Sequence, residues 1–152
     1  MIALVQRVLE SKVTVDSQLI DIIGGGLLVL LGVREEDIEN DAAYLAAKTV
    51  NLRIFPDEHD KMNLSLIDTK QEIMVVSQFT LHADTRHGNR PSFTTAAEPQ
   101  LAEHLYECYI QECKNLIGHD KVRHGKFGAM MKVKLINDGP VTIILRSKND
   151  YE

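Results

Sequence analysis

The segment from Glu72 to Leu81 constrains the fold more than any other part of the sequence. Ile73-Met74-Val75-Val76 is apolar at every position, so a strand here would bury both of its faces. Such a strand lies in the middle of a sheet that is covered on each side. Ser77-Gln78-Phe79-Thr80 follows at once and brings hydroxyl and amide groups. We therefore predict a central strand over 72–81 whose C-terminal end carries hydrogen-bonding groups at the edge of a core, a common position for binding sites.

The remaining hydrophobic pattern predicts many strands and two main helices. Residues 1–33 alternate or run in short apolar blocks, and Gly24-Gly25-Gly26 is interpreted as a turn because a strand, not a helix, follows it. Helical spacing predicts helices over 37–52 and 99–118. The side chains expected to face the core are Ile38, Ala42, Leu45, Ala46 and Val50 in the first helix and Leu101, Leu105, Tyr109 and Leu116 in the second. Further short strands are expected over 52–55, 62–67, 131–136 and 141–146. Without regular β-α alternation, this order indicates an α+β fold with a curled, barrel-like, largely antiparallel or mixed sheet.

A length of 152 residues fits one compact domain, and we expect residues 1–152 to form a single folding unit. No apolar run approaches the roughly 18–20 residues that cross a bilayer, and the first residues lack the basic start and long apolar core of a signal peptide. We therefore expect a cytoplasmic protein with no membrane contact.

The charge is negative overall and unevenly distributed. Seventeen Lys and Arg residues against 22 Asp and Glu residues give a net charge of -5, which argues against a protein that coats nucleic acid nonspecifically. Basic side chains nevertheless gather between His119 and Lys134. A polyanion could bind there, or these residues could form a solvated strand face. The candidates for the contact are Lys121, Arg123 and Lys126.

The sequence predicts no disulfide and no metal site. Cys108 and Cys113 lie five apart in a predicted helix, which places them on different faces and indicates reduced packing residues. His82, Asp84 and His87 could ligate a metal, but their spacing matches no defined site, and a solvated loop is the better interpretation.

Three local features leave alternatives open. Ser77 and Thr80 could form a site or could satisfy nearby backbone groups, and neither has an adjacent histidine to activate it. Asn137-Asp138-Gly139-Pro140 is either a plain hairpin tip or a tip that presents backbone carbonyls outward. Arg7 is the one charge on the apolar row of the first strand, so it either finds buried acceptors or extends to the surface.

Two of these segments resemble the signature motifs of a known family. Ser77-Gln78-Phe79-Thr80-Leu81 and Asn137-Asp138-Gly139-Pro140-Val141-Thr142 are similar to the SQFTL and NxGPVT motifs of the D-aminoacyl-tRNA deacylases. Further stretches in the family's style and order are 1–8, 26–33, 61–64, 90–93 and 127–131. A related deacylase subfamily alters the first motif, so its intact form here favours the D-aminoacyl type.

The resemblance implies a homodimer that hydrolyses the ester between tRNA and a D-amino acid or glycine and spares L-aminoacyl-tRNA. Gly139 and Pro140 would form a cis dipeptide that enters the pocket beside Ser77–Thr80 of the other subunit. Met131 would contribute to substrate binding, and Arg7 would brace the dipeptide.

The resemblance also assigns catalysis to Ser77, Gln78, Phe79 and Thr80. In one view of the family, backbone N–H groups near Phe79 and Thr80 and the ribose hydroxyl of the substrate position a water molecule. In an older view, Thr80 is the nucleophile. The basic residues between 121 and 134 would meet the acceptor stem of tRNA, and no metal or organic cofactor is implied.

Two other classes of function stay open. A hydrolase of other small esters could use Thr80 as its nucleophile, and it would also cleave free D-amino-acid esters. A non-catalytic RNA-binding dimer would bind tRNA and leave the ester intact.

Overall fold

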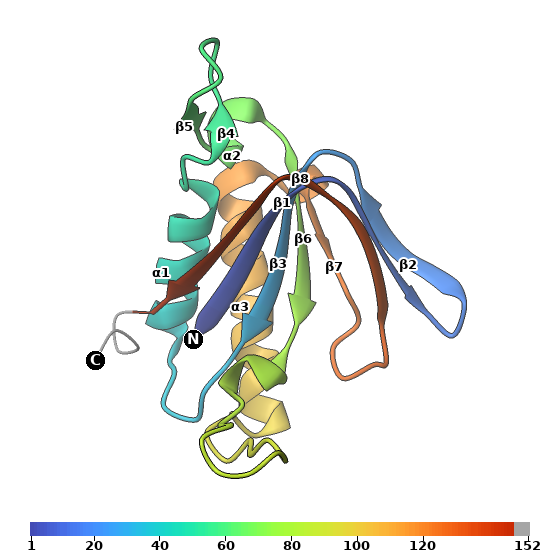
Figure 1. The fold of residues 1–152 in the computed structure, drawn as a ribbon, viewed down its shortest axis with the longest axis vertical. Helices are drawn as coiled ribbons and strands as arrows, with labels where there is room; N and C mark the ends of the chain where they lie inside the picture. The colour runs from blue at the N-terminus through green and yellow to red at the C-terminus, as the bar shows by residue number, and fades with distance from the viewer. Residues whose placement is uncertain (148–152) are drawn as a thin grey trace.

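The computed structural model describes residues 1–147, which contain a strongly bent six-stranded sheet (Figure 1). Its longest strands, β1 (Ile2–Val15) and β8 (Lys132–Arg146), pair antiparallel along almost their whole length. On its other edge β1 pairs with β3 (Gly26–Gly32) through its first half and with β2 (Gln18–Ile23) through its second half. The turn between β2 and β3 contains the predicted glycine run.

The other half of the sheet is parallel. β6 (Glu72–Ser77) lies between β3 and β7 (Val122–His124), and a short 3-10 turn, η2 (His119–Lys121), leads into β7. Asp21 of β2 and Arg123 of β7 form an ion pair of 3.3 Å across the gap between the two ends of the sheet. The sheet is therefore mixed and nearly closed, as predicted for a curled α+β fold.

A bend in β1 divides the interior into two cores. The pairing with β8 shifts register between Val8 and Glu10, and Leu9 and Glu10 are both exposed. Before the bend, Val5 packs with the two long helices, whereas after it Val13 packs into a second core inside the curled sheet. β6 contributes to both cores because alternate side chains of a strand point to opposite faces.

Two helices cover one face of the sheet. They are α1 (Glu39–Val50) and α3 (Pro99–Ile117); in Figure 1 α3 runs behind β1 and β3, and α1 lies to their left. Leu45, Leu105 and Tyr109 are fully or almost fully buried between the helices and the sheet. No helix within residues 1–147 is long and apolar enough to cross a membrane.

The helix boundaries confirm the predictions to within about two residues, but two side chains were predicted wrongly. Ile38 and Leu116 were expected to face the core, and they are 56% and 41% exposed. Ile38 precedes the first helical residue of α1, and Leu116 lies in the last turn of α3, so neither is held against the sheet.

The predicted hairpin near the C-terminus does not form. β8 is one strand, and both of its halves pair with β1 in the same antiparallel sense. Asn137 pairs with Val8 and Thr142 pairs with Gln6, so four residues of β8 lie between two partners that are only two apart in β1. Residues 138–141 are thus an outward bulge and not a chain reversal.

A short excursion between α1 and β6 also differs from the prediction. The segment expected as two strands contains β4 (Phe55–Pro56), β5 (Met62–Leu64) and the one-turn helix α2 (Leu66–Thr69). α2 begins because the Asp68 N–H donates to Ser65 Oγ while the Asp68 carboxylate accepts from the Ser65 N–H at 2.8 Å.

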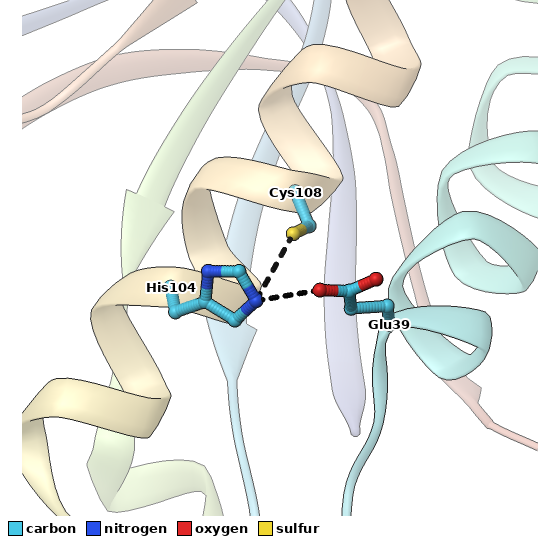
Figure 2. Close-up of side chains that lie close together, drawn as sticks. All are labelled: Glu39, His104 and Cys108. Carbon is cyan, nitrogen blue, oxygen red and sulfur yellow. Dashed lines mark hydrogen bonds and ion pairs between the residues drawn. The ribbon is translucent and has the colours of Figure 1, made fainter.

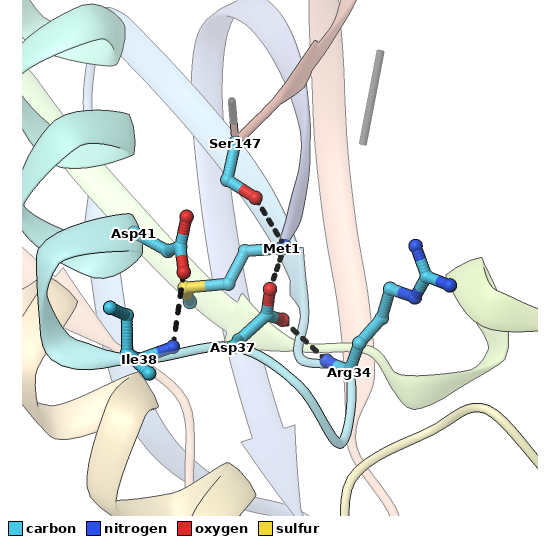
Figure 3. Close-up of polar contacts among 6 residues, drawn as sticks. All are labelled: Met1, Arg34, Asp37, Ile38, Asp41 and Ser147. Atoms are coloured by element: carbon cyan, nitrogen blue, oxygen red, sulfur yellow. Dashed lines mark hydrogen bonds and ion pairs between the residues drawn. The ribbon is translucent and has the colours of Figure 1, made fainter. Parts of the chain in front are cut away.

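The two ends of the described chain meet beside α1 (Figure 3). The amino group of Met1 donates to the Asp37 carboxylate and to Ser147 Oγ, and the Asp37 carboxylate also accepts from the Arg34 N–H at 2.6 Å. The amino group of Met1 therefore connects the residue after β8 with Asp37, which precedes α1.

Candidate active site

Residues Ser77–Thr80, here called the strand-end segment, lie where β6 leaves the sheet. β6 ends at Ser77, and Phe79–His82 form a 3-10 turn, η1, so the predicted strand through Leu81 is four residues too long. The Gln78 N–H donates to the Leu31 carbonyl of β3 at 2.8 Å, which fixes the first residue after the strand. After Gln78 the chain turns away from the sheet into η1.

The turn after β6 packs directly on Gly32, the last residue of β3. A Cβ at Gly32 would lie 3.0 Å from the Gln78 carbonyl oxygen and 3.1 Å from both Leu81 Cβ and His82 Nε2. Only a residue without a side chain leaves η1 this close to β3. Gly32 is therefore a positioning residue that the sequence interpretation missed.

The outer residues of the strand-end segment face solvent. Phe79 is 56% exposed, and its ring meets the edge of the Phe93 ring at a centroid distance of 5.1 Å. Thr80 is exposed, and its hydroxyl oxygen accepts a hydrogen bond from the Gln78 side-chain amide. Within residues 1–147 no histidine or carboxylate is hydrogen-bonded to this hydroxyl, so no general base contacts Thr80 in the described structure.

Met131 lies near the end of β6. The Gly125 N–H donates to the Val75 carbonyl at 2.8 Å, so the chain after β7 continues beside β6. A Cβ at Gly125 would lie 2.5 Å from Met131 Sδ and 3.7 Å from Val76 Cγ2. Met131 and the exposed Lys126 are therefore placed at the end of β6 where Ser77 lies.

An electropositive groove of about 620 Å³ runs beside the end of η1. Arg34, Arg86 and Arg146 line it together with His82 and Asp84. The Arg86 guanidinium donates to both carboxylate oxygens of Asp84, at 2.9 and 2.7 Å, and these hydrogen bonds lower the pKa of Asp84 to about 2. Asp84 is thus ionised at neutral pH and neutralises one of the three arginines.

The second motif forms the bulge on β8, here called the Asp138–Pro140 bulge. Gly139 and Pro140 are exposed, and the peptide bond between them is cis. Gly139 has φ +126°, a conformation that L side chains rarely adopt, and a Cβ there would lie 2.9 Å from Val141 Cγ2.

The buried side chain of Arg7 contacts this bulge. Its Nε donates to the Asp138 carbonyl at 3.2 Å and pairs with the Asp138 carboxylate at 2.9 Å, while Nη1 donates to the Ile54 carbonyl. The side chain is only 10% exposed. Arg7 is therefore a buried arginine with acceptors on Asp138 and Ile54, and the alternative of an arginine extended to the surface is wrong.

The strand-end segment and the bulge lie at different ends of the sheet. The bulge is opposite Arg7 of β1, Arg7 pairs with Leu27 of β3, and Leu27 pairs with Ile73, four residues before Ser77. The two motifs are three strand spacings of about 4.8 Å apart across the sheet and four residues of about 3.3 Å apart along a strand. The resulting separation is roughly 20 Å. In Figure 1 the bend of β8 is accordingly at the top of the sheet, and β6 runs downward away from it.

The three basic candidates do not form one patch. Lys121 is half-buried before β7, Lys126 is exposed after it, and Arg123 is paired with Asp21. Arg123 therefore contributes to closing the sheet, and Lys126 is the exposed candidate, which lines a cavity with Glu107 and Lys114 of α3.

Comparison with known proteins assigns the chain to a family. Residues 4–146 match the family model described as D-Tyr-tRNA(Tyr) deacylase, and the chain belongs to that family. A relative named D-aminoacyl-tRNA deacylase, from Thermosipho africanus, is 52% identical over 149 residues that cover 98% of this chain and 99% of the relative.

Solved structures with the same fold extend the comparison. One, described as c-Myc DNA Unwinding Element Binding Protein, is 41% identical with a TM-score of 0.92 and covers 97% of this chain and 99% of its own. Another, described as a probable eukaryotic D-amino acid tRNA deacylase, is 14% identical with a TM-score of 0.85 over 95% of this chain and 97% of its own, which supports the fold alone.

Proposed function

We propose that the protein hydrolyses the ester bond of D-aminoacyl-tRNA and releases the free D-amino acid and tRNA. The observation that carries the proposal is the full-length membership of the deacylase family, with both signature segments intact and exposed. Glycyl-tRNA is the second expected substrate, because glycine has no side chain to be rejected. Because tRNA is the substrate, we expect the protein to act in the cytoplasm.

The two motifs would form one site only between two subunits. A separation of roughly 20 Å within one chain is too great for both to contact one aminoacyl ester. The exposed Gly139 and Pro140 therefore lie out of reach of the strand-end segment of their own chain. We infer a homodimer in which the Asp138–Pro140 bulge of each subunit enters the strand-end segment of its partner.

Rejection of L-aminoacyl groups then follows from the backbone of the bulge. Carbonyl groups held rigidly at Gly139 and Pro140 can accept hydrogen bonds from the substrate ammonium and can occupy the space where an L side chain would project. The cost for the L substrate is steric clash and loss of hydration. Arg7 keeps the bulge in place through Asp138, so it acts as a positioning residue.

The chemistry would rest on hydrogen-bond donors and on the substrate. N–H groups in the first turn of a helix have no partner inside that helix, and Phe79 and Thr80 open η1. They can donate to the oxyanion that forms when water attacks the ester. The absence of a base hydrogen-bonded to Thr80 within residues 1–147 favours water positioned by the substrate ribose over a Thr80 nucleophile.

Contact with tRNA would come from basic groups around the end of β6. Lys126 follows β7 on that side, and Arg34 and Arg146 line the neighbouring groove. These charges can meet phosphates of the acceptor end and draw the substrate in at low salt.

The decisive experiment is a deacylation assay with D-tyrosyl-tRNA, L-tyrosyl-tRNA and glycyl-tRNA, with D-tyrosine methyl ester beside them. We expect hydrolysis of the D and glycyl substrates and little of the L substrate or the methyl ester. Equal cleavage of the methyl ester would indicate a general esterase, and binding of tRNA without hydrolysis would indicate a non-catalytic RNA-binding protein.

Mixing two inactive variants tests the shared site. Gly139→Ala damages the bulge and Gly32→Val displaces η1. After refolding together, a heterodimer has one site in which both motifs are intact if the sites are shared, and none if each site lies in one subunit. We expect activity to return on mixing, and failure to return in proven heterodimers would overturn the shared site.

A further inference from the structure

Three side chains that could bind a metal meet where the first turn of α1 faces α3 (Figure 2). They are Glu39 of α1 and His104 and Cys108 of α3. His104 Nε2 lies 2.7 Å from Glu39 Oε1 and 3.8 Å from Cys108 Sγ. The three ligand atoms all lie within 4.8 Å of one another.

The secondary structure explains why they meet. His104 and Cys108 are four residues apart on one helix, so their side chains lie one above the other on the same face. Glu39 is the first helical residue of α1, which packs against α3. Cys113, by contrast, is completely buried in the main core, so the two cysteines have different environments.

The set of donors suits zinc. Zn²⁺ binds Cys sulfur at about 2.3 Å, His nitrogen at about 2.0–2.1 Å and carboxylate oxygen at about 2.0–2.2 Å in tetrahedral geometry. These lengths place neighbouring ligand atoms about 3.3–3.6 Å apart. The sulfur to nitrogen separation is already close to that value. The Glu39 carboxylate has to withdraw from His104 Nε2 by well under 1 Å, and its separation from Cys108 Sγ, now within 4.8 Å, has to reach the same range. Glu39 and His104 are 69% and 55% exposed, so their side chains have room for this movement.

The local charge is mixed. Glu39, Glu107 and Glu112 place negative charge around Cys108, while Lys114 and Lys126 line the same cavity as His104 and Cys108. The same carboxylates lower the electrostatic cost of bringing a divalent cation to the site. A bound metal then replaces the thiol proton, which is released to solvent.

We propose that Glu39, His104 and Cys108 form a zinc-binding site, with water as the fourth ligand. The site is separate from the strand-end segment and from the Asp138–Pro140 bulge. Bound zinc would join the start of α1 to the middle of α3. It would stabilise the folded chain and take no part in ester hydrolysis.

Cobalt titration of the purified, metal-free protein tests the site directly. Co²⁺ is a spectroscopic substitute for Zn²⁺, and a sulfur-to-cobalt charge-transfer band in the near ultraviolet reports a Cys ligand. We expect this band to saturate at one Co²⁺ per chain and to disappear when Zn²⁺ is added. We expect Zn²⁺ to raise the melting temperature.

Variants identify the ligands. Because loss of even an outer partner of a metal ligand costs about 10–100-fold in affinity, Cys108→Ser and His104→Asn should each weaken binding at least that much. Cys108→Ser should also remove the charge-transfer band, and Glu39→Gln should weaken binding. Glu107→Gln is the matched control, since Glu107 acts on Cys108 by charge without belonging to the three ligands, and it should keep the band and stoichiometry.

Alkylation with iodoacetamide gives an independent measurement. Zn²⁺ should slow the modification of Cys108, while Cys113, whose burial raises its pKa to about 12, should remain unmodified with or without metal. The proposal is wrong if Co²⁺ gives no saturable band in the folded wild type, or if Cys108→Ser and His104→Asn leave the affinity unchanged.

Discussion

The strand-end segment and the Asp138–Pro140 bulge carry the two motifs of one family, and the protein holds them in place by different means. The strand-end segment continues a strand buried on both faces, and backbone hydrogen bonds to β3 and close packing on Gly32 fix it. The bulge stands out from the sheet, and the side chain of Arg7 is its principal anchor. Changes at the first region should therefore affect stability and activity together, whereas changes at the second should affect activity more than stability.

The largest effect is expected for Arg7→Ala. The bulge would lose both hydrogen bonds to Asp138, and a displacement of about 1 Å at a site can cost about 100-fold in rate. The unpaired carbonyls should lower the free energy of unfolding by only about 1–3 kcal/mol. Initial rates with D-tyrosyl-tRNA and urea unfolding measure the two quantities.

The control for Arg7 is Arg53→Ala, because Arg53 also donates to a backbone carbonyl, that of Asn63, but on the surface. Its rate and stability should stay close to those of the wild type. A fully active Arg7→Ala protein would show that the bulge needs no anchor.

The next largest effect is expected for Gly32→Ala. The new Cβ would meet the Gln78 carbonyl at 3.0 Å, so η1 has to shift. Overpacking of this kind costs about 1–3 kcal/mol, and we expect the rate to fall about tenfold in parallel. Gly24→Ala is the matched control, since its Cβ would have no neighbour closer than Glu72 Oε2 at 4.0 Å. If Gly32→Ala loses stability but keeps its full rate, η1 does not position the reaction.

A smaller effect is expected for Thr80→Ala. The substitution removes the hydroxyl but leaves the backbone N–H groups, each worth about 2.7–4 kcal/mol as an oxyanion donor. The rate should therefore fall only a few-fold, as it should for the neighbouring Ser77→Ala. Rapid-quench measurement of a covalent intermediate gives the opposing test, because a trapped acyl group on Thr80 would establish it as the nucleophile.

The smallest effect is expected for the basic residues. Substitution of Lys126 and of Arg123 should differ in its effect on the salt dependence of tRNA binding. Removing one cation that pairs with a phosphate should reduce the slope of log affinity against log salt by about 0.7–0.9, so Lys126→Ala should flatten the salt dependence of binding to tRNA. Arg123 is committed to Asp21, so Arg123→Ala should leave the slope unchanged and cost at most about 1 kcal/mol of stability. Equal slopes for the wild type and Lys126→Ala would move the tRNA-binding surface away from the end of β6.

Local patterns predicted most elements of this fold. The continuous apolar run of β6 and the 3.6-residue spacing of α1 and α3 depend only on which faces of an element must be buried. The end of β6 was predicted too far along because Leu81 prolongs the apolar pattern, while the turn depends on Gly32 in another strand. α2 was missed although its capping residues, Ser65 and Asp68, are visible in the sequence.

The two motifs could be found in the sequence, but their supports could not. Nothing near Asp138 indicates that its partner is Arg7, which is 131 positions away along the chain. Likewise the cluster of Glu39, His104 and Cys108 needs two helices to pack, so Cys108 alone was interpreted as a packing residue.

The sequence by itself determined the α+β class, the positions of the main helices and strands, and the two segments that carry the family's motifs, because these depend on short-range periodicity and residue type. Only the tertiary structure decided that β8 is one bulged strand, that Arg7 is buried beneath the bulge, and that the two motifs lie at opposite ends of the sheet. The physical reason is that β-pairing joins residues far apart in sequence. A strand's own residues set which faces are apolar, but its partner sets where it bends and what it meets.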